Sequence, residues 1–116
     1  ALNTDVFIRV WQALGQQGEY RSYGWVVKAD ADAVFFPQRL RDLLPQVNAG
    51  STPTWLNNCK WGMHGPIEVQ NREAVDAFLA GYQQCEGIRQ AAMDTNYPDP
   101  RDEDHAFGED QYLRRC

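Results

Sequence analysis

The predicted fold is decided by the stretch YGWVVKADAD at residues 23–32. Residues 23–29 are rich in aromatic and β-branched side chains and almost continuously apolar, which is typical of a central β-strand covered on both faces. Asp30 and Asp32 follow at once, so both carboxylates are expected in a turn at the carboxyl end of this strand. Open α/β sheets place their ligands at that end of the strands.

Amphipathic helices are predicted on both sides of this strand. Upstream, residues 4–14 carry apolar side chains with the i, i+3, i+4, i+7 spacing of one helical face: Phe7, Val10, Trp11 and Leu14. Downstream, Pro37 stands at a natural first helical position, and Leu40, Leu43 and Leu44 are expected to form a buried face. The order of helix, strand, acidic turn and helix indicates an α/β layer.

The remaining residues predict shorter elements. Short strands are expected at 54–56 and 66–69, with the tight glycine-containing segment 60–65 between them. Asn71 is expected to cap a helix that ends at Gly81, because its side chain can accept a backbone N–H of the first turn. Residues from about 86 to 107 lack periodicity and predict a surface loop, after which a last helix starts near Gly108.

The composition fits one small domain and argues against two kinds of partner. The chain has 116 residues, of which 43% are hydrophobic, enough to bury a core. Its formal net charge is −5 and its 11 Lys and Arg are scattered, which argues against nucleic acid. No apolar run approaches the roughly 18–20 residues that cross a bilayer. Membrane attachment is therefore expected only through an anchor outside this sequence.

The sequence contains an odd number of cysteines, namely Cys59, Cys85 and Cys116. In a lumenal protein this indicates one disulfide and one thiol with a partner elsewhere, whereas three reduced thiols are the alternative. A bridge between Cys59 and Cys85 would close a loop of about 26 residues and contribute about 3 kcal/mol. Zinc is disfavoured, because no two cysteines have the C-x₂₋₄-C spacing.

The two aspartates are the first candidate site. Two carboxylates one residue apart can share Mn²⁺ or Mg²⁺, whose open positions accept phosphate oxygens. The alternative to a metal site is a solvated acidic loop. The predicted strand that precedes the two aspartates favours the metal site. An EF-hand is excluded, because no acidic residue follows Asp32 until Asp42.

Two further segments carry groups that suit catalysis or binding. Glu109 and Asp110 stand at a helix start, where a carboxylate can remove a proton from a hydroxyl or simply complement the helix dipole. In the segment 62–65, glycines permit close approach to a ligand and His64 can donate to a phosphate or sugar oxygen. A plain turn with a surface histidine is the alternative there. Trp61, if exposed, suits stacking on a sugar.

Three motifs together resemble fringe-like and β-1,3-galactosyltransferase-like glycosyltransferases. Residues 25–34 (WVVKADADAV) and the leucine-bearing 39–44 are similar to the family's metal-binding strand and following helix. Residues 62–69 and 71–75 resemble its glycine-rich segment, strand and capped helix. Residues 108–113 (GEDQYL) are similar to its Glu-Asp helix start. The motifs keep the family's order over about residues 23–116.

The resemblance implies a partial GT-A fold, a Rossmann-related three-layer sandwich with a mixed central sheet and helices on both faces. It implies Mn²⁺-dependent, inverting transfer from a nucleotide-sugar, expected to be a UDP-sugar, to a glycan or glycoprotein hydroxyl in the Golgi or ER lumen. Asp32 would be the main metal ligand with Asp30 assisting, and Asp110 the base with Glu109 beside it. The predicted substrate-binding residues are Lys28, Gly62, His64, Gly65 and Trp61.

The sequence also departs from the family pattern. Ala31 stands where the family commonly has Asp. The family's nucleotide-binding βαβ portion would precede Ala1 and its late histidine ligand would follow Cys116, so residues 1–116 are expected to be one partial domain, the metal-binding and acceptor half, inactive by itself. Two alternatives stay open: a non-catalytic sugar- or cation-binding domain of the same fold, and a disulfide-stapled interaction module.

Overall fold

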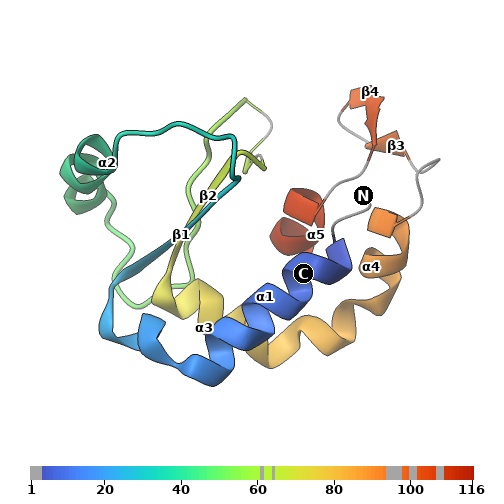
Figure 1. Ribbon diagram of the computed structural model, residues 1–116, viewed down its shortest axis with the longest axis horizontal. Coiled ribbons are helices and arrows are strands. Elements are labelled where there is room, and N and C mark those ends of the chain that lie inside the picture. Colours follow the sequence, from blue (N-terminus) through green and yellow to red (C-terminus); the bar gives the residue numbers. More distant parts are fainter. Residues whose placement is uncertain (1–3, 61, 64, 94–97, 100–101, 107–108) are drawn as a thin grey trace.

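The computed structural model describes residues 4–60, 62–63, 65–93, 98–99, 102–106 and 109–116 (Figure 1). The α-helices are α1 (Thr4–Gln17), α2 (Pro37–Leu43), α3 (Arg72–Gly81), α4 (Glu86–Met93) and α5 (Glu109–Arg115). The strands are β1 (Trp25–Ala29), β2 (Ile67–Asn71), β3 (Pro98–Asp99) and β4 (Asp102–Ala106). Short 3₁₀ turns are η1 (Glu19–Ser22), η2 (Leu44–Gln46) and η3 (Tyr82–Cys85). This mixture of helices with small antiparallel sheets confirms the α/β class at a coarse level.

The predicted helices form where the capping residues place them. α1 ends just before Gly18, whose φ of 72° lies in the left-handed region that favours glycine. α2 begins at Pro37, as predicted. The Asn71 side chain accepts the backbone N–H of Ala74 at 2.9 Å, which confirms the predicted N-cap of α3.

The central strand of the sheet is β2, not β1. β1 and β2 pair antiparallel over their whole length. On the opposite edge of β2, Leu56 N donates to Val69 O at 2.9 Å and Asn71 N donates to Thr54 O at 2.9 Å. Segment 54–56 therefore lies beside β2 as a single bridge rather than as a full strand.

The prediction that residues 23–29 form a strand covered on both faces is consequently wrong. No residue of β1 is buried, whereas four of the five residues of β2 are buried. The sequence misleads here because β2 contains Glu68, Gln70 and Asn71, polar residues that reduce its apolar character but are nevertheless buried in the structure.

The core lies between the helices rather than on the sheet. α1 packs against α3, α4 and α5, and α3 also contacts both strands of the first sheet. The buried cluster consists of Ile8, Trp11, Tyr20, Met63, Val75, Phe78, Cys85, Tyr112 and Leu113. The ring of Phe78 lies near its centre, because it contacts the rings of Trp11, Tyr82 and Tyr112.

Helix α2 has no buried residue, in contrast to α1, α3 and α5. Figure 1 shows it at the edge of the molecule, on the side of β1 away from α4 and α5. Leu43 is exposed, and Leu40 and Leu44 are only partly covered. The prediction of a buried leucine face on this helix is therefore wrong.

Two further predictions need correction. The segment expected to be a loop from about 86 begins with helix α4, and residues 98–99 and 102–106 pair as β3 and β4. The disulfide joins Cys85 to Cys116, with 5.5 Å between their Cα atoms, so the pairing of Cys59 with Cys85 is wrong. Cys59 keeps its thiol, which lies 3.5 Å from the carbonyl oxygen of Gly62.

Candidate functional site

The acidic turn directly follows the last residue of β1. Asp30 N donates to Pro66 O at 3.1 Å, which extends the β1–β2 pairing by one residue into the turn. Ala33 N donates to Asp30 O at 2.9 Å and closes the turn. The Asp30 side chain is 37% exposed, and Asp32 is exposed as well. Both carboxylates of the predicted metal site are therefore accessible to solvent.

A lysine connects this turn to the sheet. Lys28 lies directly opposite Glu68 in the β1–β2 register. Its Nζ atom is 2.9 Å from Glu68 Oε1 and 3.4 Å from Asp30 Oδ1, and 3.8 Å from the centre of the Phe7 ring on α1. The ammonium group thus holds a strand, a helix and the acidic turn together.

Burial makes the Lys28–Glu68 pair costly to break. The Glu68 side chain is 0% exposed and that of Lys28 is 10% exposed. A carboxylate removed from water is tolerated when a cation and hydrogen bonds compensate it. The prediction that Lys28 binds substrate stays a prediction, and its ammonium already contacts two carboxylates.

Sequence reasoning missed Glu68, Phe7 and Arg114 as parts of this region. The available signal for Glu68 was an acidic residue in a predicted strand with a lysine in the neighbouring one, but only the register shows that the two face each other. Nothing in the sequence connects Phe7 to Lys28 or Arg114 to Gly62, because those contacts depend on how α1 and α5 pack.

The glycine segment approaches α5 closely. Gly62 has a φ of 115°, a backbone conformation that favours glycine, and a Cβ atom there would lie 3.1 Å from Cζ of Arg114. The same guanidinium lies 5.6 Å from the centre of the Trp55 ring. The close approach predicted for Gly62 is therefore made to a side chain of α5, whereas a Cβ at Gly65 would meet open space.

Some predicted site residues cannot be placed with their side chains. Helix α5 starts at Glu109, as the acidic pair predicts, and Asp110 is its second residue. The side chains of Glu109 and Asp110 lie outside the described part of the chain, and so do Trp61 and His64 altogether. The structure thus brings the backbone of Asp30 in the acidic turn to Pro66, which directly follows the glycine segment, and places Gly62 of that segment against Arg114 of α5.

The described residues fit one kind of metal site and not another. Among them, no group of three or more His, Cys, Asp or Glu residues is found that could hold an ion as an all-protein cage. Mg²⁺-type ions are commonly bound by one or two carboxylates together with water and substrate phosphates. The exposed pair Asp30 and Asp32 fits this second arrangement.

Comparisons with protein-family models, curated proteins and solved structures found no match for this chain. The resemblance to fringe-like glycosyltransferases therefore has neither support nor opposition from a matching protein. Within the described residues, no helix combines the length and apolar content needed to cross a membrane.

Proposed function

We propose that this chain contributes the metal-binding and acceptor-side part of a glycosyltransferase. The reaction is transfer of a sugar from a nucleotide-sugar, taken to be a UDP-sugar, to a hydroxyl of a glycan or glycoprotein, with inversion. The observation that carries the proposal is the contiguity of the three motifs of the resemblance. Asp30 bonds to Pro66, and Gly62 lies against Arg114 of the helix that begins at Glu109.

In this proposal Asp32 and Asp30 hold Mn²⁺ or Mg²⁺. The ion neutralises charge on the diphosphate leaving group when it is bound. The Lys28 ammonium, fixed 2.9 Å from Glu68 and 3.4 Å from Asp30, limits the movement of the Asp30 carboxylate and reduces the local negative charge. Asp30 is accordingly assigned the assisting role and the more exposed Asp32 the main one.

The acceptor side of the proposal rests on α5. Asp110 is the base that removes the proton of the attacking hydroxyl, and Glu109 lies beside it in the sequence. The first turn of a helix favours ionised carboxylates, because the helix dipole is positive there. Tyr112 and Leu113, buried on the same helix, anchor α5 against the core and so restrict where its first residues can move.

A larger fold and a cellular location belong to the same proposal. The three-layer GT-A sandwich requires further strands, and β1 offers an edge that no described strand occupies. A Golgi or ER location agrees with the disulfide between Cys85 and Cys116, since disulfides form and persist in oxidising compartments.

Paramagnetic broadening by Mn²⁺ tests the metal site without requiring turnover. Amide signals of the isotope-labelled protein are recorded while Mn²⁺ and UDP are added, with Mg²⁺ and UDP as the diamagnetic reference. Signals of residues 29–33 are expected to broaden first. Asp32→Asn should weaken Mn²⁺–UDP binding by at least about tenfold, since even loss of an indirect partner of a ligand typically costs about 10–100-fold.

Asp42→Asn on α2 is the matched control, because Asp42 is also an exposed aspartate but bonds to Gln38 outside the turn. It should leave the Mn²⁺–UDP affinity unchanged. Equal broadening in Asp32→Asn and the unaltered protein, or broadening spread evenly over the surface, would sink the metal assignment. Manganese-independent transfer of a UDP-sugar would contradict the mechanism.

A further inference from the structure

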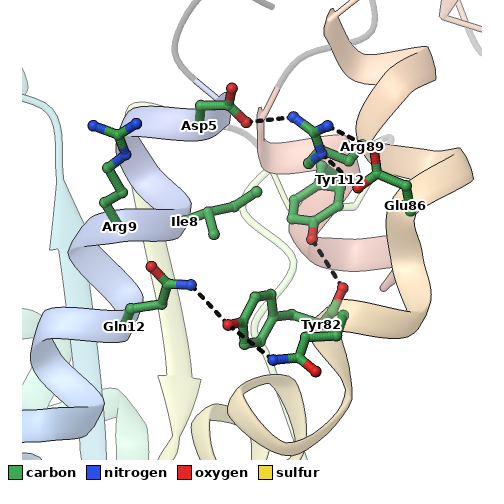
Figure 2. Close-up of a pocket in the computed structure, with 9 residues that line it drawn as sticks. Asp5, Ile8, Arg9, Gln12, Tyr82, Glu86, Arg89 and Tyr112 are labelled. Atoms are coloured by element: carbon green, nitrogen blue, oxygen red, sulfur yellow. Dashed lines mark hydrogen bonds and ion pairs between the residues drawn. The ribbon is translucent and has the colours of Figure 1, made fainter.

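A cavity lies away from the acidic turn, between α1, η3, α4 and α5 (Figure 2). Its volume is about 390 Å³, within the roughly 300–1,000 Å³ range of small-molecule sites. The walls are mostly polar, and Asp30 and Asp32 are not among the residues that line it. A ligand here would therefore be recognised by hydrogen bonds rather than by apolar contact alone.

The charges around this cavity cancel. Asp5 and Glu86 supply two carboxylates, and Arg9 and Arg89 supply two guanidinium groups. Arg89 Nη1 lies 2.8 Å from Asp5 Oδ1, while its Nε and Nη2 atoms donate to the two Glu86 oxygens at 2.7 and 2.6 Å. The lining residues therefore carry no net formal charge, so their net charge does not favour an ion of either sign.

The hydroxyl group of Tyr82 can donate a hydrogen bond to a ligand in this cavity. Tyr82 Oη accepts from Gln12 Nε2 at 2.7 Å and from Gln83 Nε2 at 3.5 Å. Hydrogen bonds from Gln83 and Gln12 lower the pKa of the Tyr82 hydroxyl, which makes it a better donor. Both contacts use lone pairs of the oxygen and neither uses its proton, which can be donated to an oxygen acceptor on a ligand.

Aromatic rings give the cavity a rigid, partly apolar wall. The Tyr82 and Tyr112 side chains both line it, and Tyr112 Oη lies 3.5 Å from the backbone oxygen of Tyr82. Phe78 supports both rings from the core, at centroid distances of 5.9 and 6.1 Å. The disulfide between Cys85 and Cys116 joins η3 to the end of α5, the two elements that carry these tyrosines.

We propose that this cavity binds a neutral, hydroxyl-rich ligand, namely one or two sugar units of a glycan. A pyranose ring presents hydroxyl groups around its rim and C–H groups on its faces. It therefore suits a site that combines amide, phenol, guanidinium and carboxylate groups with aromatic rings. The inference goes beyond the proposed transferase function, because binding here needs neither metal nor nucleotide.

Saturation-transfer NMR with neutral disaccharides tests the site. Lactose, cellobiose and N,N′-diacetylchitobiose are each titrated into the protein without metal or UDP, and an anionic heparin disaccharide serves as the charged comparison. At least one neutral disaccharide is expected to receive saturation and to shift amide signals of residues 81–86. Tyr82→Phe keeps the ring and removes the donor, so affinity should fall about three- to tenfold.

Tyr23→Phe is the matched control, because Tyr23 is an exposed tyrosine that lines a different hollow, beside β1 and α2. It should leave disaccharide binding unchanged. Gln12→Met, which keeps side-chain length and removes the bond to Tyr82, should weaken binding in the same direction as Tyr82→Phe. Amide spectra of each variant verify that the protein is folded.

Three results would overturn the inference. The first is no transfer to any neutral disaccharide at about 20 mM, a concentration at which weak millimolar binding would be detected. The others are stronger transfer to the heparin disaccharide and equal disaccharide affinity in Tyr82→Phe and the unaltered protein. The outcome is separable from the metal test. Disaccharide binding without Mn²⁺–UDP binding would support this site and contradict the metal assignment of Asp30 and Asp32. Mn²⁺–UDP binding without disaccharide binding would support the metal assignment and contradict this site.

Discussion

Apolar residues are buried on the helical side of the molecule and exposed on the side of β1 and α2. On the helical side, α1, α3 and α5 each contribute buried apolar residues to the core, although Val10 of the predicted α1 stripe is 50% exposed, and Phe78 is only 7% exposed. On the side of β1 and α2, Val34 is 90% exposed and Phe36 is 62% exposed. Figure 1 shows α2 apart from the helices that form the core.

This difference shows that the formation of a helix or strand and its burial have different requirements. Pro37 starts α2 and the apolar residues of β1 extend the chain, so both elements form where local preferences predict. Burial requires in addition that another element lies against the apolar face, and the described residues provide that for α1 but not for α2. The stability of the chain should therefore depend far more on the helical side.

The largest expected effect comes from truncating a ring on each side. Phe78→Ala should reduce the free energy of unfolding by about 3–5 kcal/mol, because it leaves a cavity among Trp11, Tyr82 and Tyr112. Phe36→Ala, which removes an exposed ring stacked on Arg39, should cost less than about 1 kcal/mol. Urea denaturation measures both, and equal losses would remove the contrast.

The disulfide should have the next effect. Replacing both Cys85 and Cys116 by serine should lower the free energy of unfolding by about 2–4 kcal/mol, since the bridge restricts a separation of 31 residues in the unfolded chain. Cys59→Ser, a change on the loop side, should cost less than about 1 kcal/mol. Denaturation of both variants without reductant is the measurement, and a larger loss for Cys59→Ser would contradict the assignment.

Glu68→Gln tests the contact between the sheet and the acidic turn. The loss should be about 1.5–3 kcal/mol, as expected for a hydrogen bond between charged groups, because the fully buried carboxylate that faces Lys28 is neutralised. Glu73→Gln, which removes the partner of Arg72 on the surface of α3, should cost less. Thermal unfolding of both variants is the measurement. A smaller loss of stability in Glu68→Gln than in Glu73→Gln would contradict the role of Glu68 in holding Lys28.

The smallest effect is a pH dependence on the helical side. Hydrogen bonds from Arg89, then Gln90, lower the pKa of Glu86 from 4.5 to about 2. A lowered folded-state pKa adds stability above pH 4.5, and this contribution disappears as the pH falls towards 2. The unfolding midpoints of Glu86→Gln and the unaltered protein should therefore differ at neutral pH and converge in acid, and salt should reduce the difference. A constant difference down to pH 2 would contradict the shift.

Local signals predicted most of the elements. Helix periodicity identified α1, Pro37 the start of α2, Asn71 the cap of α3 and the acidic pair the start of α5. These depend on hydrogen bonds and dihedral preferences within a few residues, which the sequence contains. Helix α4 was missed, because Asn96, Pro98 and Pro100 further on indicated a loop from the beginning of the segment.

Relations between distant residues were much harder to predict. The central position of β2, the pairing of Lys28 with Glu68 and the disulfide to Cys116 depend on how separate elements pack. For the candidate site, the sequence predicted the turn that carries Asp30 and Asp32. It could not predict that a buried carboxylate would hold the lysine beside them.

The bridge between Cys85 and Cys116 turns residues 85–116 into a covalent ring. A protease that cuts a single bond inside this ring would release no fragment, because both pieces stay attached through sulfur. The cut protein would migrate as one chain until a reducing agent separated it. Helix α5, with the acidic residues of the proposed base, would thus remain tethered to the core after such a cut.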